Sequence, residues 1–78
     1  MRVLYLHSLR QITGCTEEVL SETPATVDAL ISLLLERHPA LGPHRASLRI
    51  ARNHEWAAPE DGLSPNDEVA VMPPLSGG

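Results

Sequence analysis

The sequence predicts an α+β fold in two layers, in which a mixed sheet of four to five strands packs on one main helix. Residues 27–38 repeat apolar side chains at helical spacing, and several short segments have the apolar or alternating pattern of strands. Their order is strand, strand, helix, strand, short strand, strand. Because a single helix covers only one face of a sheet, two layers are the economical arrangement.

The composition limits what such a domain can be. A chain of 78 residues is close to the smallest that buries a core without help, so its stability must come from its many aliphatic side chains. The one cysteine, Cys15, cannot form an internal disulfide, which is typical of a reducing cytoplasm. The histidines have no zinc-type spacing and no cysteine pair beside them, so no bound metal is expected.

Charge and hydropathy exclude two classes of partner. Six basic residues stand against ten acidic ones, which gives a formal net charge of −4, whereas nucleic-acid binding requires Lys and Arg to neutralise phosphates. No segment approaches the roughly 20 apolar residues that cross a bilayer. We therefore expect a cytoplasmic protein with no nucleic-acid and no membrane partner.

The first two strands are expected to form a hairpin. Residues 3–6 form a compact apolar run, and residues 17–21 can pair back on it as a second strand. Between them, residues 8–13 form a connection or a single helical turn, which Gly14 closes.

The helix over residues 27–38 has the clearest signals. Thr26 can cap it, because its hydroxyl accepts a hydrogen bond from an amide of the first turn, and Asp28 complements the helix dipole. Pro39 ends it. One continuous apolar stripe is formed by Val27, Leu30, Ile31, Leu34 and Leu35.

The second half of the chain supplies the remaining strands. Residues 41–45 read as a loop, residues 47–52 alternate as a half-buried strand, and residues 56–58 form a short returning strand. Residues 68–72 form the last strand, which Pro73 and Pro74 end because they lack amide donors. The first and last strands are expected to be central neighbours.

The alternation of the last strand predicts a partner surface. If Val69 and Val71 face the helix, Met72 faces away from it, on the same side as Leu6 and Trp56. An exposed apolar patch of this kind marks a protein interface. The alternative is that Leu6 and Trp56 are ordinary core residues. Arg10 either contacts acidic groups of a partner or is a solvated surface residue.

Candidate catalytic groups are scarce, and the most distinctive segment is the last one. Cys15 is interpreted as an incidental thiol in a loop, because the acidic residues that follow it disfavour a thiolate nucleophile. We predict a folded domain over residues 1–72 and a flexible tail over residues 73–78. In that tail Gly77 and Gly78 have no side chains, so the terminal carboxylate could pass through a narrow channel. The alternative is a frayed end.

The residues of this last segment carry a family resemblance. Residues 67–78, DEVAVMPPLSGG, resemble the terminus of the small subunit of molybdopterin synthase, the MoaD-type sulfur carrier. Residues 2–6, 26–30 and 50–53 also resemble that family, so the likeness spans essentially the whole chain. Where the family often has aromatic residues, this chain has Val71 and Met72.

The resemblance implies a ubiquitin-like β-grasp fold and a role for the C-terminus. An E1-like adenylating enzyme would use ATP and magnesium to activate Gly78, and a persulfide donor would convert it to a thiocarboxylate. The tail would then enter the large synthase subunit and give sulfur to cyclic pyranopterin monophosphate. The small subunit would bind no cofactor and would have no activity alone. Besides Gly78 and Gly77, partner-binding residues would be Leu6, Arg10, Trp56, Met72, Pro73, Pro74, Leu75 and Ser76.

Other functions are compatible with the same features. Related carriers serve thiamin synthesis and tRNA thiolation, although the thiamin type usually lacks the Pro-Pro pair. A ubiquitin-like modifier would join Gly78 to lysines of substrate proteins. A third alternative is an interaction module with an inert tail.

Overall fold

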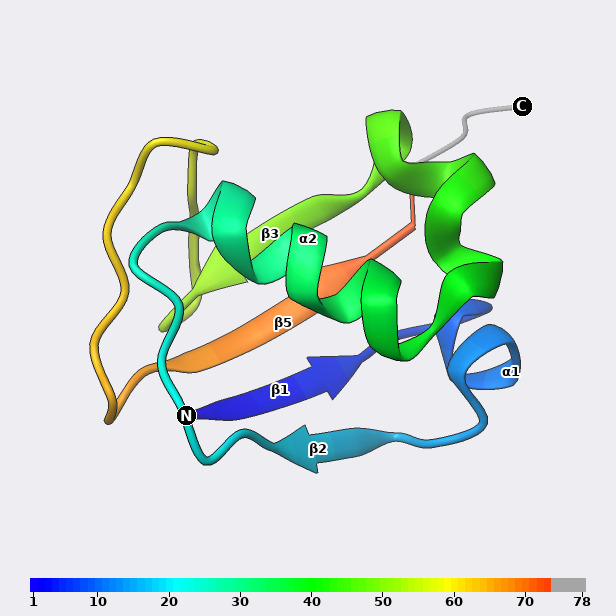
Figure 1. Cartoon of the computed structure of the whole chain (residues 1–78), viewed down its shortest axis with the longest axis horizontal. Helices are drawn as coiled ribbons and strands as arrows, with labels where there is room; N and C mark the ends of the chain where they lie inside the picture. Colours follow the sequence, from blue (N-terminus) through cyan, green and yellow to red (C-terminus); the bar gives the residue numbers. More distant parts are fainter. Residues whose placement is uncertain (74–78) are drawn as a thin grey trace.

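A five-stranded mixed sheet forms one layer of the protein, and helix α2 lies across one of its faces (Figure 1). The structure is a computed structural model that describes residues 1–73. A mixed sheet with a helix on one face confirms the predicted α+β class. The elements are β1 (Arg2–Tyr5), α1 (Leu9–Thr13), β2 (Glu17–Val19), α2 (Val27–Arg37), the 3₁₀ helix η1 (Pro39–Ser47), β3 (Arg49–Arg52), β4 (Glu55–Trp56) and β5 (Glu68–Met72).

The strands lie in the order β2-β1-β5-β3-β4. β1 and β5, the first and last strands of the chain, pair in parallel at the centre, as predicted, and the other neighbours pair antiparallel. The crossover from β2 to β3 contains α2, which covers one face of the sheet. None of the helices within residues 1–73 is long and apolar enough to cross a membrane.

Helix α2 has the predicted cap and the predicted buried stripe. The Thr26 hydroxyl accepts a hydrogen bond from the Ala29 amide at 3.1 Å, and Asp28 lies in the first turn. The helix ends at Arg37, with His38 as its C-cap, one residue earlier than predicted. Of the stripe, Leu35 is only partly buried, and the buried members are Val27, Leu30, Ile31 and Leu34.

The loop predicted over residues 41–45 is wrong, because the chain forms the 3₁₀ helix η1 there. Gly42 and Pro43 indicate a turn, but neither excludes a 3₁₀ helix, because Gly42 does not adopt a positive φ here and Pro43 removes only one amide donor. Pro39 ends α2 and also begins η1, since its missing amide costs nothing in a first turn. The gain is burial of Leu41, whose side chain is fully inside the core.

Most strand boundaries differ from the prediction by one or two residues. β1 ends at Tyr5, β2 ends at Val19, and β3 begins at Arg49. The short returning strand is β4 at Glu55–Trp56 rather than residues 56–58. It begins early because Asn53 and His54 form a tight two-residue turn, in which both have positive φ angles of 51° and 72°. The predicted helical turn before β2 is confirmed as α1.

The core lies between α2 and one face of the sheet. Val69 and Val71 on β5 are fully buried against the helix side, as the alternation predicted. They pair in register with Val3 and Tyr5 of β1, so the same face of both strands enters the core. The other buried side chains are Leu9, Leu20, Val27, Leu30, Ile31, Leu34, Leu41 and Ile50.

A polar network joins the β1–β2 hairpin to the end of α2. Tyr5 is buried, and its hydroxyl donates a 2.6 Å hydrogen bond to Glu18 Oε1. His38 Nε2 lies 2.5 Å from the same oxygen, and Arg37 donates to Glu18 Oε2 at 3.1 Å. Partial burial alone would raise the pKa of Glu18, but the hydrogen bonds from Tyr5, His38 and Arg37 lower it below its usual value.

We expect Tyr5→Phe to destabilise the protein by about 1.5–3 kcal/mol, because it removes a partly buried hydrogen bond to a charged group while the aromatic ring stays in place. Urea unfolding of the two proteins measures the difference. Glu36→Ala, an exposed change on α2, is the control and should shift stability by less than about 0.5 kcal/mol. A loss for Tyr5→Phe as small as the control would show that Glu18 is held by His38 and Arg37 alone.

Candidate functional site

The face of the sheet opposite α2, here called the open face, carries a row of apolar side chains. Leu4 on β1 pairs with Ala70 on β5, Ala70 pairs with Ala51 on β3, and Ala51 pairs with Trp56 on β4. Paired residues in a sheet point to the same face, so these four side chains form one line across four strands. The two alanines lie in the middle of the line and the larger side chains at its ends.

This row creates a shallow hollow on the open face. Its volume is about 390 Å³, and apolar side chains supply most of its lining. The small side chains of Ala51 and Ala70 form the floor, and larger ones stand around it. The lining residues are Leu4, Leu6, Ala51, His54, Trp56, Glu68, Ala70 and Met72. Such an apolar concave surface can receive a side chain of a partner protein.

Trp56 is the most exposed apolar side chain of the hollow. Its side chain lies at the sheet edge and is 58% exposed. The Arg49 guanidinium is 5.6 Å from the centroid of its ring, close enough for a cation–π contact. An indole that is held in place and exposed is typical of an interface anchor.

Charged residues border the hollow on one side. The Arg2 guanidinium bridges two carboxylates, at 2.6 Å from Glu17 and 3.0 Å from Glu68. The hydrogen bond that Arg2 donates lowers the pKa of the Glu17 carboxyl group. The open face thus has an apolar centre with a charged rim, an arrangement common to protein interfaces.

The structure brings together three of the predicted partner-binding residues. Leu6, Trp56 and Met72 all line the hollow. The alternative of core residues is wrong for Trp56, which is mostly exposed, and Leu6 is only partly buried. Whether these residues bind a partner stays a prediction.

The other predicted residues lie elsewhere. Arg10 is exposed on α1, and its Nε donates to the Tyr5 carbonyl at 3.0 Å, which holds it at the end of the sheet where β1 and β5 finish. Pro73 directly follows β5 and is partly buried. The remaining predicted positions are outside the described residues: Pro74, Leu75, Ser76, Gly77 and Gly78.

Sequence reasoning missed Leu4, Ala51 and Ala70 as parts of the hollow. The alternation that placed Met72 away from the helix also placed Ala70 there, so this residue could have been found. Leu4 and Ala51 needed the register between strands, which the pattern of one strand does not contain.

Comparison with known proteins agrees with the fold and places the chain in a family. The sequence profile of the ThiS family matches residues 3–78. The chain belongs to the ThiS family.

Relatives of this ThiS-family chain have informative names. It is 37% identical over 82 residues to the molybdopterin synthase sulfur carrier subunit of Chlamydomonas reinhardtii, covering 100% of this chain and 98% of that one. The protein of the same name from Homo sapiens is 38% identical over 84 residues, with coverages of 100% and 93%. The predicted resemblance to small subunits of molybdopterin synthase is therefore confirmed.

Solved structures match the fold of this ThiS-family member. The crystal structure of small archaeal modifier protein 1 from Haloferax volcanii superimposes with a TM-score of 0.79 at 26% identity, covering 96% of this chain and 97% of that one. The predicted ubiquitin-like β-grasp fold is thereby confirmed.

Proposed function

We propose that this protein is the sulfur carrier subunit of molybdopterin synthase. The observation that carries the proposal is the full-length match to proteins of that name, which includes the segment Pro-Pro-Leu-Ser-Gly-Gly at residues 73–78. A match over the whole chain favours the same division of labour, in which the domain recognises partners and its last residue carries the sulfur.

The chemistry would take place on the carboxylate of Gly78. That carboxylate is unreactive until it is activated, so a separate E1-like enzyme would join it to AMP from ATP, with magnesium, and release pyrophosphate. A persulfide donor would attack the acyl carbon and displace AMP, and reductive cleavage of the resulting S–S bond by a thiol would leave the thiocarboxylate. This thiocarboxylate would give its sulfur to cyclic pyranopterin monophosphate in the active site of the large subunit.

The open face supports a docking role in this scheme. The hollow lies beside β5, and residues 73–78 follow directly from that strand, so a partner seated on Trp56 and Met72 would stand next to the emerging tail. The catalytic acid and base would belong to the large subunit, and we expect the reaction to occur in the cytoplasm.

A second candidate function is protein modification. The fold match to small archaeal modifier protein 1 favours it, because a modifier uses the same activated C-terminus. In that case the activated Gly78 would form an amide with a lysine of another protein instead of accepting sulfur.

Intact-mass measurement separates the two functions. Protein purified from cells with a working activating enzyme should contain a fraction heavier by one oxygen-to-sulfur exchange. Lysine conjugates together with free carboxylate, and no thiocarboxylate, would refute the carrier proposal. Mixing the thiocarboxylate form with a molybdopterin synthase large subunit and cyclic pyranopterin monophosphate should yield molybdopterin. A carrier for thiamin synthesis or tRNA thiolation would give none.

A further inference from the structure

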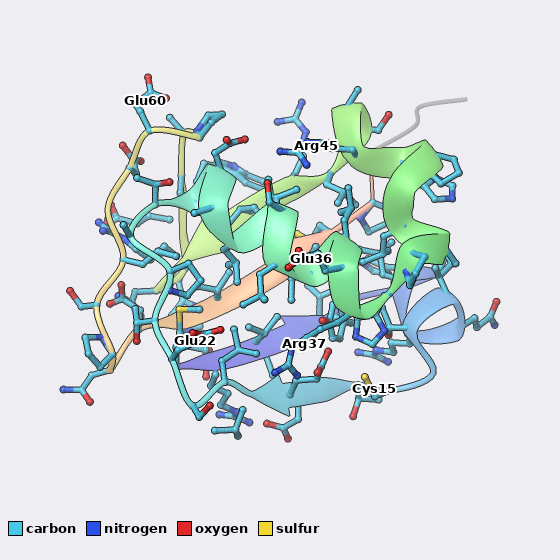
Figure 2. All side chains as sticks on the ribbon, viewed as in Figure 1. Cys15, Glu22, Glu36, Arg37, Arg45 and Glu60 are labelled. Carbon is cyan, nitrogen blue, oxygen red and sulfur yellow. The ribbon has the colours of Figure 1, made fainter. Side chains whose placement is uncertain are left out.

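Three side chains with metal-binding atoms converge on the far side of the sheet from the hollow. Cys15 Sγ, a Glu18 carboxylate oxygen and a His38 ring nitrogen all lie within 4.8 Å of one another, and all three residues are partly buried. They come from the α1–β2 connection, from β2 and from the C-cap of α2. Figure 2 shows Cys15 beside the start of β2, with Arg37 reaching toward that strand from α2.

The backbone fixes each of these side chains. Gly14, with a φ angle of 78°, turns the chain after α1, and Thr13 Oγ1 then accepts from the Cys15 amide at 3.4 Å. Glu18 pairs in register with Val3, so it points to the helix side of the sheet. The His38 amide donates to the Leu34 carbonyl at 2.8 Å, which fixes its backbone at the helix end, and its ring packs edge-on against the Tyr5 ring with the centroids 5.6 Å apart. The cluster is therefore built by the fold rather than by chance contact of mobile side chains.

We propose that Cys15, Glu18 and His38 form a Zn²⁺ site. A thiolate, an imidazole and a carboxylate suit zinc, whereas Mg²⁺ and Ca²⁺ prefer oxygen ligands alone. Ligand atoms around a tetrahedral Zn²⁺ are roughly 3.5 Å apart, as follows from metal–ligand distances of about 2.0–2.3 Å. The donors are close enough to reach that spacing with small side-chain adjustments.

The charges and hydrogen bonds around the cluster fit a bound dication. Binding releases the Cys15 thiol proton and removes the proton that His38 Nε2 donates to Glu18 Oε1, so Zn²⁺ would replace that hydrogen bond and be balanced by one thiolate and one carboxylate. Tyr5 donates to Glu18 Oε1, and Arg37 holds Oε2 at 3.1 Å, so both oxygens keep partners that orient the carboxylate. Three protein ligands leave one coordination position for water or another small ligand.

Zinc at this position would connect the hairpin to the end of α2. It would also cover the Cys15 thiol, which is a free thiol in the described structure. Bound metal should therefore raise the thermal stability of the protein and slow the reaction of Cys15 with thiol reagents.

The test is a titration of the reduced, metal-stripped full chain with Co²⁺, a spectroscopic substitute for Zn²⁺. We expect one equivalent to bind with a thiolate-to-Co²⁺ charge-transfer absorption, and Zn²⁺ to displace it. Cys15→Ser should abolish the charge-transfer band, and His38→Gln should weaken binding about tenfold or more. Zn²⁺ should also slow labelling of Cys15 in the native protein.

His54→Gln provides the matched control. His54 Nε2 also lies near a glutamate, 3.8 Å from Glu68 Oε1, but its side chain is 88% exposed. This variant should bind Co²⁺ like the native chain. Circular dichroism shows whether each variant is folded. If His38→Gln does not fold, the result for the Cys15→Ser variant decides the test. The proposal is overturned if Co²⁺ gives no charge-transfer band, if Cys15→Ser binds it unchanged, or if Zn²⁺ leaves Cys15 labelling unaffected.

Discussion

Deleting Gly78 is expected to abolish thiocarboxylate formation while the domain stays folded. The deletion moves the terminal carboxylate back by one residue, which is up to about 3.5 Å of chain. Group transfer to an activated acyl carbon depends on placing that carbon accurately, and a displacement of about 1 Å can already cost roughly 10²-fold in rate. Adenylation of the shortened chain should therefore fall by at least that factor, as measured by pyrophosphate release and by intact mass.

Stability is the second measurement for this deletion. The described core extends from Val3 to Val71 and precedes the tail in the sequence, so we expect the free energy of unfolding to change by less than about 0.5 kcal/mol. Ser76→Ala is the matched control, because it keeps the length of the tail and both glycines. Normal sulfur loading after deletion of Gly78, or a large fall in stability, would contradict this division between domain and tail.

The elements that were predictable are those whose pattern repeats locally. Val27, Leu30 and Leu34 recur at helical spacing, and that spacing alone identifies both the helix and its buried side. On β5 the alternation of Val69 and Val71 with Met72 gives the two faces of the strand. Once one helix has to cover one face, the position of Met72 on the open face follows.

The features that were missed depend on contacts between distant segments. Residues 39–47 contain Gly42 and two prolines, which indicate a loop, yet the burial of Leu41 favours a 3₁₀ helix. The floor of the hollow depends on strand register. Likewise, Cys15 and His38 have no metal-type spacing along the chain, and it is the pairing of β2 with β1, under the end of α2, that brings them together.

Replacing Trp56 is expected to give the largest loss of partner binding from a single change in the described domain. Trp56→Ala removes the exposed indole at the edge of the hollow and leaves Arg49 without its aromatic contact. Buried tryptophans at interface centres contribute about 2 kcal/mol or more, so affinity for the large synthase subunit should fall by roughly 30-fold. Because the side chain is mostly exposed in the free protein, the fold should tolerate its loss. Isothermal titration calorimetry with the large subunit measures the affinity.

Val19→Ala is the control that makes this test specific for the hollow. Val19 is also an exposed apolar residue, with 75% of its surface accessible, and it lies on the edge strand β2. It pairs with Arg2, so it belongs to the same open face, but it does not line the hollow. If exposed apolar area alone governed docking, the two variants would weaken binding to a similar extent. If the hollow receives a side chain of the partner, Trp56→Ala weakens binding strongly and Val19→Ala changes it less than about twofold, since peripheral contacts contribute little.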